Sequence, residues 1–235
     1  MITINYGGRL GNNMIQYSAA RLFSNKHKIK LITPPINGDI NFTSLLKSND
    51  DTDHQSYQNT TQIVNNNNFL SLLEMNDVPK QHYVFSDYFQ FEEFFTKYDN
   101  EIKNLFKEDK TKRDGVFVHY RIGDIMNLKN MLPIDYYLDA LNRINVNGGY
   151  ITSDTPDHPN VIDISQKYGL EILNLDPLST IDLGRKFDNI VLSEGTFSWW
   201  IGQLSNANTI YYNKRNRFWH GEIFTNKNWI DLRYD

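Results

Sequence analysis

Short apolar runs alternate along the chain with longer stretches in which apolar residues recur every three or four positions. The short runs are rich in Ile, Val, Tyr and Phe, which is typical of buried strands, and the longer spacing is typical of helices with one buried face. The predicted strands are Ile2–Tyr6, Ile29–Thr33, Tyr83–Ser86, Val116–His119, Gly149–Thr152, Glu171–Leu173, Ile190–Ser193 and Thr209–Tyr212. The predicted helices are Asn12–Asn25, Phe91–Phe106, Ile134–Ile144, Pro159–Lys167, Thr180–Lys186 and Ser198–Ser205. This alternation predicts an α/β fold with mainly parallel sheets.

Two polar regions interrupt the alternation. Asn49–Asn68 ends in a run of Asn residues, so we predict a loop or a weakly ordered insert there. Lys107–Gly115 is charged, has little apolar content and ends in Gly, which makes it the best candidate for a linker. The chain has 235 residues, enough for two small domains, so we expect one domain over 1–110 and a second over 111–235.

Composition and charge exclude several function classes. The net charge is −4, and a mildly acidic chain is a poor general binder of nucleic-acid backbones, which attract a basic surface. Cysteine is absent, which excludes disulfides, thiol nucleophiles and Cys-ligated metal sites. We find neither a secretory signal nor a run of about 20 apolar residues. We therefore expect a soluble, cytoplasmic protein without a membrane span.

The first segment with candidate chemistry is the glycine-rich turn Gly7–Gly11, which joins the first predicted strand to a helix. Glycines let a backbone approach a ligand closely, and the amides at a helix start favour anions. The spacing matches neither of the common nucleotide-binding glycine fingerprints. Taken alone, a tight turn that packs a helix on a sheet explains the segment better.

The second segment follows the predicted strand Val116–His119 and brings His119, Arg121 and Asp124 to its carboxyl end. Open α/β sheets bind ligands at that end of their strands, and an Arg can hold two phosphate oxygens there. Alternatively, Arg121 and Asp124 form a salt bridge and His119 fills a gap in the core. The segment by itself does not decide between these interpretations.

The third segment is Ser153-Asp154, again at a strand end. An Asp in this place can accept hydrogen bonds from a guanine edge or a ribose. A helix N-cap or an Asx turn near Thr155 is the simpler explanation when the segment is considered alone.

The fourth segment leaves a predicted strand at Ser193, turns at Gly195 and starts a helix near Thr196. Hydroxyls at Thr196 and Ser198, beside backbone amides at a helix start, could form a phosphate cradle. The alternative is an ordinary hydroxyl N-cap followed by two core tryptophans at 199 and 200. Because the run Thr-Phe-Ser-Trp-Trp is uncommon, this segment is the strongest of the four.

Together the segments resemble the α-1,2-fucosyltransferase family, glycosyltransferase family 11, and more loosely the superfamily of α-1,2-, α-1,6- and protein O-fucosyltransferases. Residues 8–17 (GRLGNNMIQY) are similar to the family's GG-LGNQMFQY, and residues 87–95 (DYFQFEEFF) to its GYFQSEKYF. Residues 119–124 (HYRIGD) are similar to HxRRGD, and residues 193–200 (SEGTFSWW) to SNSTFSWW. Ser153-Asp154 falls where the family has SDD. Ordered matches along most of the chain are harder to meet by accident than any single one.

The chain departs from the family pattern at several positions. Ile122 replaces the second Arg of HxRRGD, Glu194 and Gly195 replace Asn-Ser, and Asn13 replaces Gln. The chain is also shorter than expected for the family. These departures affect the expected acceptor more than the donor class, although they leave open a donor other than GDP-fucose.

The resemblance implies a GT-B-like architecture of two Rossmann-like halves that face each other across a nucleotide-sugar cleft. Residues 1–110 would form the acceptor-side half, and residues 111–235 the GDP-sugar-binding half with a closing segment at Phe218–Trp229. The implied reaction is an inverting transfer of L-fucose from GDP-β-L-fucose to a hydroxyl, such as the 2-OH of a galactose-type sugar, with no cofactor besides this donor. Another GDP-sugar transferase, a protein O-fucosyltransferase or a non-catalytic sugar-binding module is the alternative.

The resemblance also implies roles for single residues. Arg121 would hold the leaving diphosphate with help from Thr196, Phe197 and Ser198, and His119 would touch the donor. Asp154 would read the guanine or the ribose, while Gly11 and Asn12 would close over the donor from the other half.

The general base is the least determined of the implied roles. Asp124 is the first candidate because it shares a strand end with Arg121, and Glu194 is the second. No strand carries the Asp-x-Asp of metal-dependent transferases, and an Arg can replace a divalent ion at a diphosphate, so we expect no metal.

Overall fold

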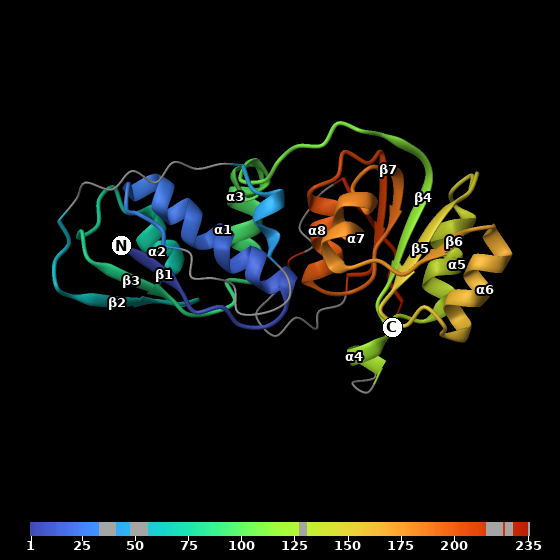
Figure 1. Ribbon diagram of the computed structural model, residues 1–235, viewed down its shortest axis with the longest axis horizontal. Coiled ribbons are helices and arrows are strands. Elements are labelled where there is room, and N and C mark those ends of the chain that lie inside the picture. Colours follow the sequence, from blue (N-terminus) through green and yellow to red (C-terminus); the bar gives the residue numbers. More distant parts are fainter. Residues whose placement is uncertain (33–40, 48–55, 127–130, 215–222, 224–227, 235) are drawn as a thin grey trace. The chain divides into compact units, whose positions relative to one another are not determined.

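The chain forms two compact units in the computed structural model, which describes all residues except 33–40, 48–55, 127–130, 215–222, 224–227 and 235. The boundary between the units lies between Lys107 and Glu108, where the predicted linker begins (Figure 1). Strand β4 already begins at Arg113, so the connecting segment is shorter than predicted. No helix within the described ranges has the length and apolar character needed to cross a membrane.

The N-terminal unit has a three-stranded parallel sheet in the order β1-β3-β2. Its strands are β1 (Ile2–Ile4), β2 (Thr61–Val64) and β3 (His82–Phe85), and its helices are α1 (Leu10–His27), the short 3-10 helix η1 (Phe42–Leu45), α2 (Phe69–Glu74) and α3 (Glu92–Asn104). Helix α1 is buried at 15 of its 18 residues. It is therefore a central helix of this unit rather than a surface helix with one apolar stripe.

The C-terminal unit has a six-stranded parallel sheet in the order β6-β5-β4-β7-β8-β9. Its strands are β4 (Arg113–Tyr120), β5 (Gly149–Ser153), β6 (Glu171–Leu173), β7 (Phe187–Val191), β8 (Thr209–Tyr212) and β9 (Ile230–Asp231). Its helices are α4 (Gly123–Met126), α5 (Ile134–Asn142), α6 (Pro159–Tyr168), α7 (Pro177–Gly184) and α8 (Thr196–Gln203). When the six strands are numbered from 1 in chain order, this is the doubly wound, Rossmann-like order 3-2-1-4-5-6. Successive strands are added on one side of β4 up to β6 and on its other side from β7 onward, so the order reverses between β4 and β7.

Helices cover both faces of this sheet, with α5 and α6 on one face and α7 and α8 on the other (Figure 1). Because side chains alternate along a strand, β4 serves both layers. Val116, Val118 and Tyr120 are fully buried in the core with α5 and α6. Phe117 points the other way, so close to α7 that a Cβ at Gly184 would collide with its ring. His119 follows Phe117 on the α7–α8 face.

The predicted α/β class with parallel sheets is confirmed, and some element boundaries are corrected. In the described part of Ile29–Thr33 only a single bridge forms, between Leu31 and Ile2, in place of the predicted strand. The insert predicted at Asn49–Asn68 contains strand β2 among its described residues. Helix α7 starts earlier than predicted because Asp176 caps it, accepting hydrogen bonds from Leu178 N at 3.0 Å and Ser179 N at 3.1 Å.

The closing segment predicted at Phe218–Trp229 is described only in part. Phe218, Trp219 and His220 lie outside the described residues. Trp229 packs edge to face on Tyr212, with ring centroids 6.1 Å apart, and lies against Gly202 of α8. This tryptophan therefore belongs to the packing of the C-terminal unit.

Candidate functional site

The carboxyl ends of three adjacent strands, β5, β4 and β7, bring three of the predicted segments to one edge of the C-terminal sheet. The segments are 119–124 at the end of β4, Ser153-Asp154 at the end of β5 and 193–198 after β7. The sheet order reverses between β4 and β7, and doubly wound folds bind their ligands outside the carboxyl ends of the strands at that point. The candidate site is therefore the region around the ends of β4 and β7 and the start of α8.

His119 is held in place by a serine of α8. Its Nδ1 lies 2.5 Å from Ser198 Oγ, and Ser193 N donates to the same oxygen at 2.9 Å. The Phe197 ring lies 5.1 Å away between ring centroids. Burial lowers the pKa of His119 to about 4, with the Asp154 carboxylate acting against this shift and the Arg121 charge acting with it. His119 is therefore uncharged at neutral pH.

Arg121 forms a two-pronged ion pair with Asp124. Nε donates to one carboxylate oxygen at 2.9 Å and Nη2 to the other at 2.6 Å. The two side chains are 26% and 31% exposed, so the pair lies at the edge of the site and not in the core. The salt bridge that the sequence offered as one of two interpretations is present, and the diphosphate contact of Arg121 stays a prediction.

The third guanidinium nitrogen of Arg121, Nη1, lies against Gly195 at the start of α8. A Cβ at residue 195 would collide with Nη1, and Gly195 has φ 95° and ψ 167°, a conformation that side chains rarely allow. No side chain among the described residues caps α8, and the amide of Trp199 makes the bond back to the N-cap carbonyl. The positive N-terminal end of α8 and a guanidinium nitrogen therefore lie next to each other, and the two positive charges together favour binding of an anion.

Asp154 holds the turn after β4. One of its oxygens accepts hydrogen bonds from Ile122 N at 2.8 Å and Gly123 N at 3.1 Å, and the other also lies 3.1 Å from Gly123 N. A Cβ at Gly123 would lie 2.8 Å from this carboxylate, so a glycine is needed there. Asp154 therefore fixes the backbone between Arg121 and Asp124, a role that the sequence did not indicate. Its predicted contact with guanine or ribose stays a prediction.

The first turn of α8 divides into inward and outward positions. Ser198 is fully buried, and its hydroxyl, predicted at a phosphate, is directed instead to His119 and the Ser193 amide. Trp199 and Trp200 are fully buried and pack edge to face with centroids 4.8 Å apart, as core residues. Thr196 and Phe197 are partly exposed, so they are the residues of this turn that a ligand could reach.

Two tyrosines of α5 support the site through hydrogen bonds, and no pattern in the sequence indicated this role. Tyr137 donates to Ser193 Oγ at 3.0 Å, and Tyr136 donates to Leu192 O at 2.8 Å. Ser193 Oγ also accepts from Arg121 N at 3.1 Å. Burial raises the pKa of both phenols well above the usual value, so they remain protonated donors. These bonds tie the ends of β4 and β7 together.

In the N-terminal unit, the glycine-rich turn is clamped by amide side chains. Gln16 accepts from Gly7 N at 3.1 Å and donates to Asp87 O at 2.9 Å. Gln90 donates to Asn12 Oδ1 at 2.8 Å, so the motif residues 8–17 and 87–95 are joined within this unit. Gly11 is buried in the first turn of α1. The predicted donor contacts of Gly11 and Asn12 stay predictions.

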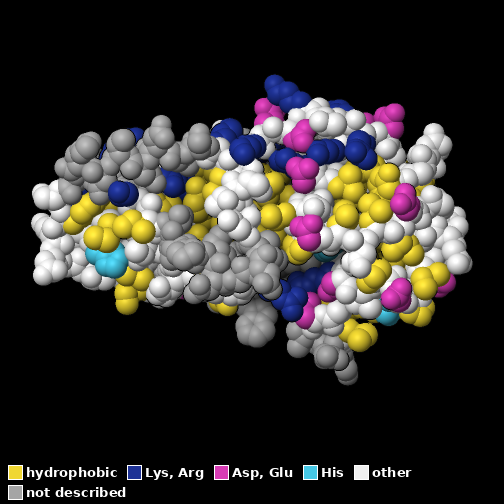
Figure 2. Space-filling model, in the orientation of Figure 1, with side chains coloured by type: hydrophobic (Ala, Val, Ile, Leu, Met, Phe, Trp, Pro, Cys, Tyr) yellow, Lys and Arg dark blue, Asp and Glu magenta, His cyan; other side chains and the backbone are white. Residues whose placement is uncertain are grey.

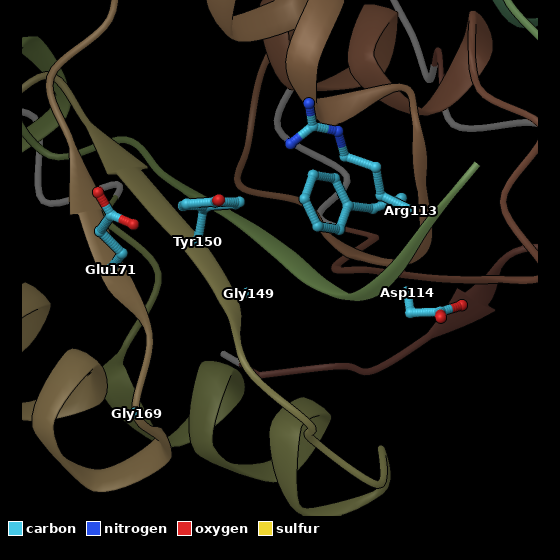
Figure 3. A pocket seen from close by; sticks show the side chains of 7 residues that line it. Arg113, Asp114, Gly149, Tyr150, Gly169 and Glu171 are labelled. Atoms are coloured by element: carbon cyan, nitrogen blue, oxygen red, sulfur yellow. The ribbon is translucent and has the colours of Figure 1, made fainter. Parts of the chain in front are cut away.

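A shallow hollow of about 510 Å³ lies at the opposite, amino end of the C-terminal sheet. Its lining residues are Arg113, Asp114, Gly149, Tyr150, Gly169, Glu171 and Phe187. The charged groups of this lining point in different directions and do not converge on one point (Figure 3). Since parallel sheets bind ligands at the carboxyl ends of their strands, this hollow is a poorer candidate than the edge around His119 and Arg121.

Charges of both signs are interspersed over the C-terminal unit on the face drawn in Figure 2. Lys112 pairs with Asp188 at 3.1 Å, and Asp182 pairs with Arg185 at 2.6 Å and with Lys186 at 2.7 Å. Such pairing neutralises these basic groups, so they offer little positive field to a nucleic-acid backbone. Within the described ranges, no three His, Asp or Glu side chains are grouped so that they could hold a metal ion.

Comparison with known proteins adds no relative to this picture. No protein-family model matches the chain, and no curated protein matches it.

Proposed function

We propose that the chain is an inverting glycosyltransferase that moves L-fucose from GDP-β-L-fucose to a hydroxyl of a glycan acceptor, the 2-OH of a galactose-type sugar in the most specific form of the proposal. The observation that carries it is the meeting of Arg121 Nη1 with the start of α8 at the point where the sheet order reverses. A nucleoside diphosphate needs such a concentration of positive charge. The motif resemblance is the reason for proposing guanine as the base of the nucleotide and fucose as the sugar.

Charge stabilisation is the main contribution that this site can make to the reaction. Negative charge grows on the diphosphate as the glycosidic bond breaks, and donors that are already oriented stabilise it without reorganisation. Asp124 holds Nε and Nη2 of Arg121, so the guanidinium is fixed and Nη1 is directed to the start of α8. Thr196 and Phe197 would complete the donor contact.

The acceptor side of the proposal rests on the N-terminal unit. In the GT-B arrangement that we propose, this unit binds the acceptor, and Gly11 and Asn12 close over the donor. Asp124 remains the first candidate for the base that takes the acceptor proton, and Glu194 the second. The reaction is proposed to need no metal, since Arg121 and the helix start supply positive charge.

The Arg121–Asp124 ion pair also supports a second candidate, a module that binds a sugar or nucleotide sugar without transferring it. A guanidinium already neutralised by a carboxylate stabilises additional negative charge less. Transfer of labelled fucose to an acceptor, or slow hydrolysis of the donor, would separate the two candidates. The binding module would do neither.

GDP is expected to raise the melting temperature of the protein more than UDP or CMP, without an added divalent ion. A ligand that binds only the folded state stabilises it by RT ln(1 + [L]/Kd), which is about 2.7 kcal/mol at a concentration of 100 Kd. Differential scanning fluorimetry at equal nucleotide concentrations, with and without EDTA, would measure this. Equal shifts for all three nucleotides, or a strict requirement for Mn²⁺, would count against the proposal.

Glu194→Asn is expected to keep the turnover of the wild type, because a carboxylate beside the leaving diphosphate would repel it and so is not needed for transfer. The matched variant Asp124→Asn should lose turnover, since it weakens the grip on Arg121 and removes the first candidate base. Steady-state kcat of both variants, with GDP binding measured in parallel, would test this. Near-total loss in Glu194→Asn with intact GDP binding would make Glu194 the base.

A further inference from the structure

A short chain of hydrogen bonds links the ends of β4 and β7 through α8. The amide of Ser193 donates to Ser198 Oγ at 2.9 Å, and Ser198 Oγ lies 2.5 Å from His119 Nδ1. Ser198 is fully buried and His119 is 6% exposed, so water does not compete for these bonds. This series of hydrogen bonds lies beside Arg121, whose own backbone amide donates to Ser193 Oγ.

The direction of each bond follows from the donors that are present. An amide N–H can only donate, so Ser198 Oγ accepts from Ser193 and keeps one hydroxyl proton to give. In the described part of the chain, His119 Nδ1 is the acceptor within reach of that proton. If Nδ1 carried the proton instead, the buried hydroxyl would have no acceptor, which is costly. Ser198 therefore donates to Nδ1.

The second ring nitrogen of His119 must then carry the ring proton, because the buried imidazole is uncharged at neutral pH. The charged groups that act on the ring are Asp154 and Arg121, and the aromatic ring of Phe197 packs beside it. Nε2 makes no hydrogen bond to any described residue. It is also not one of the fully buried side-chain nitrogen and oxygen atoms that have no hydrogen-bond partner. Nε2 thus keeps access to solvent.

We propose that Ser198 is a positioning residue that fixes His119 as its Nε2–H tautomer, so that His119 donates a hydrogen bond to a diphosphate oxygen of the nucleotide sugar. His119 then cannot take the acceptor's proton through Nε2. It adds a neutral donor beside the charge of Arg121. The identity of the ligand rests on the proposed function, whereas the tautomer rests on the hydrogen bonds alone.

The tautomer can be read directly by long-range ¹H–¹⁵N NMR of the histidine rings in the uniformly labelled protein at pH 7, with His119→Asn as the assignment control. We expect a protonated Nε2 and an unprotonated Nδ1 for His119 without any ligand, and a shift of the Nε2 resonance when GDP is added. Ser198→Ala should abolish the single tautomer and lower kcat roughly 3- to 10-fold, the range for one lost hydrogen bond. Ser198→Thr, which retains the hydroxyl, should restore both.

Ser205→Ala is the matched control, since Ser205 is also a buried serine, just past the end of α8, and donates to Gly202 O at 2.7 Å. It should lower stability without changing the His119 tautomer or kcat. A protonated Nδ1 in the wild type, or an unchanged tautomer in Ser198→Ala, would overturn the proposal. The expected tautomer without any response of Nε2 to GDP would support the role of Ser198 in orienting the ring and overturn the diphosphate contact of His119. The proposed function would fail with it only if GDP also left the melting temperature unchanged.

Discussion

Arg121→Ala is expected to lower kcat for fucosyl transfer by roughly 10²- to 10³-fold, the cost of removing a main stabiliser of developing charge. The leaving diphosphate gains negative charge as the glycosidic bond breaks, so Arg121 should matter more in the transition state than in the ground state. Since Ile122 stands where the resembling family has a second Arg, Arg121 carries this charge alone within its motif. Steady-state kinetics with saturating donor would measure the loss.

Arg143→Ala provides a matched control for this variant. Arg143 makes the same two-pronged pair, to Asp139 at 2.9 and 3.0 Å, but on the exposed surface of α5. If Arg121 were only a salt-bridge residue, the two variants would behave alike, and each would keep most of its activity. Arg121→Lys should rescue little, because an ammonium lacks the planar fork. Retention of more than about a tenth of wild-type kcat by Arg121→Ala, a loss of less than ~1.4 kcal/mol, would contradict the catalytic assignment.

Gly195→Ala is expected to have the second-largest effect, a loss of activity of about 10²-fold together with lower stability. The backbone at Gly195 has φ 95°, and a non-glycine residue in such a region costs about 1–3 kcal/mol. The new Cβ would also occupy the place of Arg121 Nη1 and push the guanidinium away from the start of α8. The loss should therefore approach that of removing Arg121, as measured by kcat and by the melting temperature.

Gly148→Ala separates the two causes. Gly148 also has a positive φ, of 81°, but a Cβ there meets nothing within 4 Å. It should lose stability and keep its kcat. The double variant Gly195→Ala, Arg121→Ala should be little worse in kcat than Arg121→Ala alone, because both changes act through one guanidinium. Additive losses in the double variant would show that Gly195 acts on the reaction by another route.

The positions of the candidate segments were well predicted from the sequence because strand ends are local features. The runs before His119, Ser153 and Ser193 were recognised as buried strands, and parallel strands place their carboxyl ends at one edge. The side chains that alternate along β4 likewise follow a period of two. The starts of helices were predicted less accurately. Helix α7 begins at Pro177, earlier than predicted, because Asp176 caps it.

The polar insert shows where local pattern was insufficient. Thr61–Val64 is a strand of the N-terminal sheet, although it lies in a stretch whose composition predicted a loop. Its backbone pairs with β3, whose residues are about 20 positions later in the chain, and this pairing supplies the hydrogen bonds that local propensity does not. Ile29–Thr33 shows the converse, since its apolar run predicted a strand and its described residues form only a single bridge.

By itself, the sequence determined the α/β class, the strands that end at the candidate site and the residues with suitable chemistry. Only the tertiary structure decided what those residues do to one another. It paired Arg121 with Asp124, turned Ser198 toward His119 and set Asp154 on the amides of Ile122 and Gly123. Such choices depend on distances between side chains from different strands and helices. Periodicity fixes the face and the end of a strand for each residue, but it does not fix the partner that a polar group finds there.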